Sequence, residues 1–220
     1  MAELIHGLEP DRVRANLERV REDIASAAAR AGREPSDVEL CAAVKYVPVD
    51  ETGALVEAGI TLAGENRQQD LAARVERFGE RLALDFIGHL QSRKVKLVLP
   101  HARLIHSVAT DSVLAQLERH GTPDTEVLVE VNLSGEENKS GVAPEDLDAF
   151  LERCPVRVGG LMTMPPLADD PEASRPWFAR LSGLAAERGL ARLSMGTSQD
   201  YAVAVEEGAT IVRVGTILYR

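Results

Sequence analysis

One lysine stands where a buried strand is expected to leave the protein core. Residues 38–44 form an apolar run without glycine or proline, Lys45 follows directly, and Pro48 and Asp50 then indicate a turn into a helix. The ammonium group of such a lysine needs solvent, a counter-charge or a ligand. Partial desolvation would lower its pKa from about 10.4 toward neutrality, and the free amine could then attack a carbonyl. A lysine that simply reaches into water is the alternative.

Two segments near the end of the chain have the composition of an anion site. Residues 194–198 (Ser-Met-Gly-Thr-Ser) run into an expected helix with Ser198 as its N-cap, and Gly215 and Thr216 follow the last expected strand. Small residues at a helix N-terminus expose backbone N–H groups, and the helix dipole favours an anion there. The alternative for each segment is an ordinary tight turn. Together they predict phosphate binding.

Arg213 lies within the apolar run of the last expected strand, just before Gly215. An arginine in this position needs an acid or a planar acceptor. One interpretation is a salt bridge to a strand-end acid such as Glu65. The other is a contact to a ligand ring nitrogen, as in one class of proteins that bind pyridoxal 5′-phosphate (PLP). A lysine, an arginine and a phosphate site on one face fit a phosphorylated aldehyde, because the amine can form a Schiff base while backbone amides hold the phosphate.

The elements that position these residues alternate between strand and helix. Strict alternation implies parallel strands, and eight of them predict a closed (β/α)8 barrel whose active face lies at the carboxyl ends of the strands. An open doubly wound sheet is the alternative, but the chain lacks a Gly-x-Gly-x-x-Gly turn. Strands are predicted at 38–44, 60–63, 84–88, 104–108, 126–131, 156–162, 192–195 and 210–214, with helices at 51–58, 67–78, 92–99, 111–120, 145–153, 174–188 and 199–207.

A further helix is expected before the first strand. Glu9-Pro10-Asp11 marks its start, apolar residues recur at helical spacing, and Gly32 ends it. Only residues 215–220 follow the last strand, so this helix could take the place of the eighth outer helix. We expect one domain over residues 1–220, with no second domain.

The composition excludes several classes of protein. Of 220 residues, 25 are basic and 35 acidic, which gives a net charge of −10. This charge argues against binding to nucleic acid or to an anionic membrane, so a phosphate ligand needs a local site of backbone N–H groups. No apolar run approaches the roughly 18 residues of a membrane span.

Motifs of metal and nucleotide chemistry are missing from the sequence. It contains no His-Glu-x-x-His, Cys-x-x-Cys or Walker loop, and Cys41 and Cys154 lie far apart. We interpret His101, His106 and His120 as ordinary structural or surface residues. The first residues do not resemble a secretory signal, so we expect a cytoplasmic protein.

Over nearly its whole length, the chain resembles the YggS/PROSC group of PLP-binding proteins, often called PLP homeostasis proteins. The residues that carry the resemblance are Ala42-Ala43-Val44-Lys45, Gly64-Glu65-Asn66-Arg67, Phe86-Ile87-Gly88-His89-Leu90-Gln91-Ser92, Lys139-Ser140-Gly141, Gly160-Leu161-Met162, Leu193-Ser194-Met195-Gly196 and Val212-Arg213-Val214-Gly215-Thr216. Several such blocks in the right order make a specific signal.

The resemblance implies the barrel of the alanine racemase N-terminal domain, and it implies a set of cofactor-binding residues. Lys139 matches a second lysine of the family, whose role stays open. The implied set is Lys45 as the Schiff-base lysine, Asn66 near the cofactor ring, Arg213 facing the pyridine nitrogen, and Ser194, Gly196, Gly215 and Thr216 around the phosphate, with Met195 and Thr197 completing the loop.

The resemblance also implies PLP supply and amino-acid homeostasis, and the group's members are not established enzymes. Racemisation needs a base on each face of the substrate carbanion, and alanine racemases draw the second base from a tyrosine associated with an additional domain. Tyr46, Tyr201 and Tyr219 offer no obvious substitute. We therefore expect a monomeric, non-enzymatic PLP carrier that could serve PLP-dependent apo-enzymes. A PLP-dependent racemase or lyase using Lys45, and a Schiff-base aldolase acting on a sugar phosphate, are the alternatives.

Overall fold

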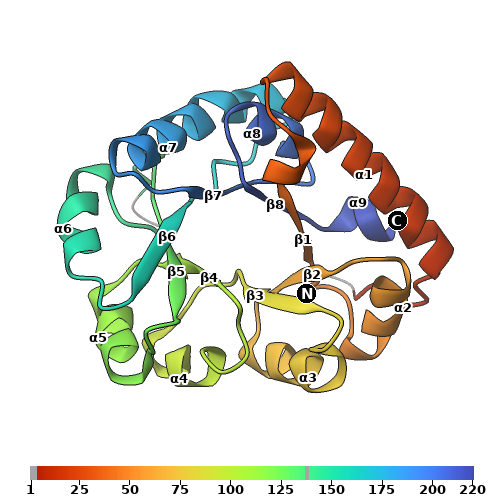
Figure 1. Ribbon diagram of the computed structural model, residues 1–220, viewed down its shortest axis with the longest axis horizontal. Helices are drawn as coiled ribbons and strands as arrows, with labels where there is room; N and C mark the ends of the chain where they lie inside the picture. The colour runs from red at the N-terminus through yellow and green to blue at the C-terminus, as the bar shows by residue number, and fades with distance from the viewer. Residues whose placement is uncertain (1–3, 137–138) are drawn as a thin grey trace.

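The computed structural model describes residues 4–136 and 139–220, and its strands form a closed barrel (Figure 1). The strands follow one another in chain order, neighbouring strands are parallel, and β8 pairs with β1. The predicted (β/α)8 barrel is therefore confirmed, and the doubly wound sheet is wrong. The strands are β1 (Glu39–Ala43), β2 (Leu62–Glu65), β3 (Ala83–Phe86), β4 (Ile105–Val108), β5 (Glu126–Glu130), β6 (Arg157–Met162), β7 (Arg192–Thr197) and β8 (Ile211–Val214).

Helices surround this barrel, as Figure 1 shows. Four of the predicted helices directly follow a 3₁₀ turn, so their α-helical parts are shorter than predicted. These turns are Val49–Glu51 before α2, Ser92–Lys94 before α4, Pro144–Asp146 before α6 and Pro171–Ser174 before α7. The helices are α1 (Pro10–Arg30), α2 (Thr52–Glu57), α3 (Gln68–Phe78), α4 (Val95–Val98), α5 (Asp111–His120), α6 (Leu147–Glu152), α7 (Arg175–Glu187), α8 (Tyr201–Glu206) and α9 (Thr216–Tyr219).

Helix α1 occupies the place of the eighth outer helix. It packs against α8, α9 and α2, so it closes the ring outside β8 and β1 (Figure 1). Its buried face includes Val13, Leu17 and Val20, which the helical spacing of apolar residues predicted. The short α9, which the sequence did not predict, buries Leu218 and Tyr219 beneath α1.

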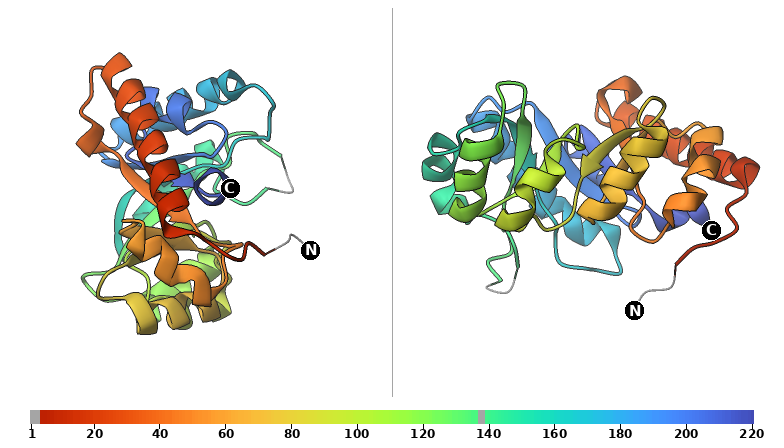
Figure 2. Two further views of the ribbon diagram at one scale, coloured as in Figure 1. Left: turned by 90° about the vertical axis from the view of Figure 1, so that its right-hand side faces the viewer. Right: turned by 90° about the horizontal axis from the view of Figure 1, so that it is seen from below.

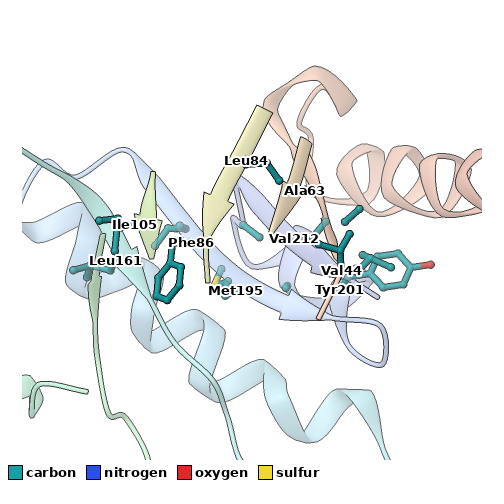
Figure 3. Close-up of a cluster of buried hydrophobic side chains, with 14 of the residues drawn as sticks. Val44, Ala63, Leu84, Phe86, Ile105, Leu161, Met195, Tyr201 and Val212 are labelled. Carbon is teal, nitrogen blue, oxygen red and sulfur yellow. The ribbon is translucent and has the colours of Figure 1, made fainter. Parts of the chain in front are cut away.

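Side chains alternate along each strand between the helix layer and the barrel axis. Val44, Phe86 and Val212 belong to the outer set, which packs as one large apolar cluster (Figure 3). The inner set is mixed in character, because buried polar side chains lie among apolar ones. The apolar inner residues are Cys41, Leu62, Leu104, Leu128, Met162 and Ile211, and the buried polar ones include Asp85, His106, Ser194 and Arg213.

All strands point the same way, so their carboxyl ends form one rim. Figure 2 shows the segments that follow β5 and β6 extending from the same end of the barrel. The candidate residues were predicted at this rim, which is where functional sites lie in barrels of this kind.

Candidate functional site

A pocket of about 320 Å³ opens at the carboxyl ends of the strands. This size falls within the range of small-molecule sites, roughly 300–1,000 Å³. Hollows of similar or larger volume lie between α1 and α9 and at the amino end of the barrel, but neither contains a predicted site residue other than Thr216. Six predicted residues line the rim pocket: Lys45, Asn66, Thr197, Arg213, Gly215 and Thr216. Ser198, which belongs to the predicted anion segment, lines it too, and the sequence missed Ala43, Tyr46, Ile87, Met164, Gln199 and Tyr219.

Lys45 leaves the end of β1 at the pocket wall. Its side chain is exposed, and its Nζ lies 4.8 Å from the centre of the Tyr46 ring. The expected partial desolvation is therefore wrong in this structure, because the rim of the barrel leaves the amine in contact with water. What the structure does provide is an accessible amine beside an aromatic ring, a favourable place for a cation.

A buried ion pair anchors the turn that carries Lys45. Arg74 of α3 and Glu65 at the end of β2 are each 1% exposed, and they meet at 3.1 Å. Arg74 also donates to the backbone oxygen of Val47 and to the hydroxyl of Thr52. The arginine thus ties α3 to both ends of the loop after β1. Since Glu65 pairs with Arg74, the predicted alternative of a Glu65–Arg213 salt bridge is wrong.

Asn66 follows Glu65 and brings an amide group to the pocket. Its backbone N–H donates to the Glu65 carboxylate at 2.6 Å, which orients the residue. Its side-chain oxygen is buried and has no hydrogen-bond partner among the described residues. A buried polar atom without a partner is costly in a folded protein, and at a pocket wall it marks a place that a ligand can satisfy.

Arg213 lies inside the barrel with its guanidinium at the pocket floor. It donates to Ser194 Oγ and to the backbone oxygen of Thr163 at 3.0 Å, and Met164 Sδ lies 2.8 Å away. Burial lowers the pKa of this guanidinium, which nevertheless stays a cation in proteins. Its contacts leave other N–H groups free to face the pocket, since a guanidinium carries five donors.

The predicted phosphate loop differs from expectation at its helix. Helix α8 begins at Tyr201, and the carboxylate of Asp200 accepts hydrogen bonds from the Thr197 backbone at 2.7 Å and hydroxyl at 3.0 Å. Ser198 is therefore not the N-cap. Its hydroxyl accepts a hydrogen bond from the Gly215 backbone N–H at 2.9 Å, so the two predicted anion segments touch each other.

Three predicted residues do not line the pocket. Ser194 is buried beneath Arg213, and the Met195 side chain packs in the outer apolar core (Figure 3). Gly196 has a φ of +89°, and a Cβ there would come within 2.6 Å of Ala204 Cβ and 2.9 Å of Tyr201 Cα. The structure thus assigns Gly196 to close strand–helix packing, which only glycine allows.

A polar group of different character lies after β5. Ser140 Oγ donates to Glu130 at 3.0 Å and lies 3.4 Å from His89 Nδ1, and burial raises the pKa of Glu130. Lys139 Nζ pairs with Glu136 at 2.9 Å and is not among the lining residues of the rim pocket. The role of Lys139 therefore stays open.

The fold and the pocket together define a class of protein. It is a (β/α)8 barrel in which a lysine amine, an arginine guanidinium and small residues surround one pocket at the carboxyl ends of the strands. The family model for the alanine racemase N-terminal domain matches residues 11–220, and the chain belongs to this family. It is 40% identical to the pyridoxal phosphate homeostasis protein of Aquifex aeolicus (strain VF5), over 92% of this chain and 95% of that one. It is 32% identical to the protein of the same name from Escherichia coli (strain K12), over 93% and 94%.

Solved structures agree with this assignment. PipY of Synechococcus elongatus PCC7942 with PLP bound has a TM-score of 0.76 and 32% identity, covering 91% of this chain and 100% of that one. Alanine racemase from Corynebacterium glutamicum has a TM-score of 0.71 at 16% identity, so it shares the fold, and the match covers 63% of its chain.

The described parts of the chain lack the features of a membrane span and of a metal site. No helix within residues 4–136 and 139–220 has the length and apolar character needed to cross a bilayer. The same residues contain no group of three or more His, Cys, Asp or Glu side chains that could hold a metal ion.

Proposed function

We propose that this chain binds PLP in the rim pocket, attached to Lys45, and acts in PLP homeostasis as a carrier. The observation that carries the proposal is the meeting of Lys45, Asn66 and Arg213 at one pocket. The names of the relatives and the PLP-bound PipY structure support it. The unpartnered Asn66 oxygen and the free N–H groups of Arg213 fit a ligand that carries both donors and acceptors.

The cofactor would supply an aldehyde, and the chain would supply the amine. Lys45 Nζ is accessible at the rim, and the Glu65–Arg74 pair holds the turn from which it extends. A primary amine in this position can bond to an aldehyde carbon as a Schiff base. The exposure of Lys45 suits reversible loading and release, because water reaches the bond.

Arg213 would face the ring nitrogen, and the two small-residue loops would hold the phosphate. The guanidinium disfavours a proton on the ring nitrogen, which weakens the ring as an electron sink. Thr197, Gly215 and Thr216 line the same pocket, with Ser198 beside them. Because Thr197 donates to Asp200 and the Gly215 N–H donates to Ser198, the hydrogen bonds to the phosphate would come from Ser198 and Thr216. Because the chain carries a net charge of −10, such local donors have to attract the anion.

The tyrosines support a carrier over a racemase. Tyr219 lines the pocket, but its hydroxyl lies 3.3 Å from the Ala43 backbone oxygen, and burial raises its pKa. Tyr201 donates to Asp23 at 2.6 Å, and burial followed by this contact raises its pKa as well. Neither phenol is suited to accept a proton at neutral pH. Tyr46 stands beside Lys45, so the racemase or lyase stays the second candidate and is testable.

Adding PLP to the purified protein tests the proposal. A visible absorbance band is expected for the wild type and for Lys96→Ala, an exposed lysine on α4, but not for Lys45→Ala. No band at saturating PLP would contradict the proposal and favour the aldolase. Turnover of L-amino acids above about 1 per second would favour the racemase.

We also propose a cytoplasmic, monomeric protein that delivers PLP to apo-enzymes. The carrier role requires a recipient, and the open rim would let one approach. Sedimentation of the pure protein measures its oligomeric state and so tests the proposed monomer. Mixing the PLP-loaded protein with a PLP-dependent apo-enzyme and measuring the gain in that enzyme's activity tests delivery.

A further inference from the structure

Four buried side chains, hydrogen-bonded one to the next, cross the barrel behind the pocket. Arg213 on β8 contacts Ser194 Oγ on β7, and Ser194 Oγ lies 2.8 Å from His106 Nδ1 on β4. His106 Nε2 in turn lies 3.1 Å from Asp85 Oδ2 on β3. Arg213 is 6% exposed and the other three side chains are 0% exposed. Of the four, only Arg213 lines the pocket.

This series of hydrogen bonds ends at the carboxylate of Asp85. Asp85 accepts two hydrogen bonds from Arg103, both at 2.8 Å. Burial raises the pKa of Asp85, but the hydrogen bonds from Arg103 and His106 outweigh it, so the pKa is lowered. An ionised carboxylate only accepts hydrogen bonds, and His106 Nε2 therefore carries a proton and donates it.

The direction of the other hydrogen bonds follows. Burial lowers the pKa of His106, which is therefore neutral, so its Nδ1 has a lone pair. Ser194 donates its hydroxyl proton to this Nδ1 and accepts from Arg213 with a free lone pair. In the other tautomer, a lone pair of His106 would face the Asp85 carboxylate, and Ser194 would accept from both His106 and Arg213, which leaves its own proton without an acceptor among these side chains. Only one arrangement satisfies every group.

We propose that His106 and Asp85 are positioning residues for Arg213, acting through the Ser194 hydroxyl. The Ser194 hydroxyl accepts a hydrogen bond from one edge of the guanidinium, and the Thr163 backbone oxygen accepts another from a second edge at 3.0 Å. With both in place, the remaining N–H groups of Arg213 are aimed at the pocket. The expected effect on PLP affinity rests on the proposed function. The direction of the hydrogen bonds that His106 makes to Asp85 and Ser194 does not depend on it.

Two replacements of His106 by side chains of nearly equal size distinguish the positioning of Arg213 from simple packing. His106→Asn places an amide oxygen near the position of Nδ1, so Ser194 keeps its acceptor, while His106→Leu removes it. Packing alone predicts that leucine is the better replacement in a buried site. Positioning predicts the reverse for PLP affinity: about threefold weaker binding for His106→Asn and about tenfold or more for His106→Leu, the effect of one charge-assisted hydrogen bond.

Ser194→Ala completes the test. It should weaken PLP binding about as much as His106→Leu. The double variant should be no weaker than either single one, because His106 reaches Arg213 through hydrogen bonds to the Ser194 hydroxyl. Equal affinity for His106→Leu and wild type, or additive losses in the double variant, would overturn the proposal.

Measurements on the protein without PLP keep the two proposals distinguishable. Nitrogen-15 NMR of labelled histidine is expected to show His106 protonated on Nε2 in the wild type and in Ser194→Ala. A proton on Nδ1 would overturn the positioning role even if PLP binds. A wild-type protein that does not bind PLP would instead end the proposed function, and a thermal melt of each variant establishes that it is folded.

Discussion

The arginines at the amino end of the barrel and the cations of the rim pocket differ in their partners. At the amino end, Arg103 bonds to Glu39 at 2.7 Å and to Asp85 at 2.8 Å, and Arg192 bonds to Glu126 at 2.9 Å. At the carboxyl end, no carboxylate of the described residues lies within ion-pair distance of Lys45 or Arg213, and the Asn66 oxygen has no partner. The ion pairs at the amino end stabilise the fold, as does the Glu65–Arg74 pair beneath the rim, whereas Lys45 and Arg213 stay available to a ligand at the carboxyl end, where sites are usual in this architecture.

One pair of substitutions tests this contrast with the largest expected effect. Arg103→Met leaves the buried Asp85 without its main partner, so we expect a loss of about 3–5 kcal/mol in the free energy of unfolding. Arg213→Met removes a buried cation that has no carboxylate partner, so stability should stay within about 1 kcal/mol of wild type while PLP affinity falls. Chemical denaturation measures the first quantity and PLP titration the second. Equal destabilisation by both variants would contradict the contrast.

The pH dependence of stability gives a smaller effect. Burial lowers the folded-state pKa of His106 below the usual 6.5, so at lower pH the unfolded chain binds a proton that the folded one does not. Stability from this group is therefore full above pH 6.5 and falls as pH drops below it, by up to about 1.4 kcal/mol per unit. Denaturation of the wild type and His106→Asn at pH 7 and at pH 5.5 measures it. The wild type should lose more on acidification, and parallel losses would argue against a buried neutral imidazole.

Glu130 at the rim is expected to show the smallest effect, with the opposite sign. Burial raises its pKa, so the folded state favours the protonated acid and is disfavoured at pH values above the folded-state pKa. Glu130→Gln keeps an acceptor for Ser140 and removes the charge. The variant should gain roughly 0.5–1 kcal/mol at pH 8 and nothing at pH 4. A loss at pH 8 would mean that the ionised carboxylate has a partner that the structure does not show.

Much of the fold was predictable because its signal is local. Each strand is a short apolar run, each helix has its own spacing, and their alternation leads to a barrel that brings Lys45 and Arg213 to one rim. Residues 38–44 and 210–214 needed no knowledge of the rest of the chain to be recognised as strands.

The details that depend on distant contacts were not predictable. Ser198 and Asp200 are both good N-cap residues, and a hydrogen bond from Gly215, 17 residues away, decides between them. His106 looked ordinary because Ser194, its hydrogen-bond partner, lies 88 residues later in the chain. The predicted partial desolvation of Lys45 was also wrong. The sequence identifies the end of a strand, but it does not show how much of the lysine side chain the surrounding loops cover.

Reduction of the protein–PLP mixture with borohydride, followed by peptide mass mapping, tests the central claim most directly. The chain has lysines only at positions 45, 94, 96 and 139, so the site of attachment is unambiguous. We expect the added pyridoxyl phosphate on the peptide containing Lys45 at one equivalent of PLP. Attachment chiefly to Lys139, or equally to all four lysines, would contradict a cofactor site at the carboxyl end of β1.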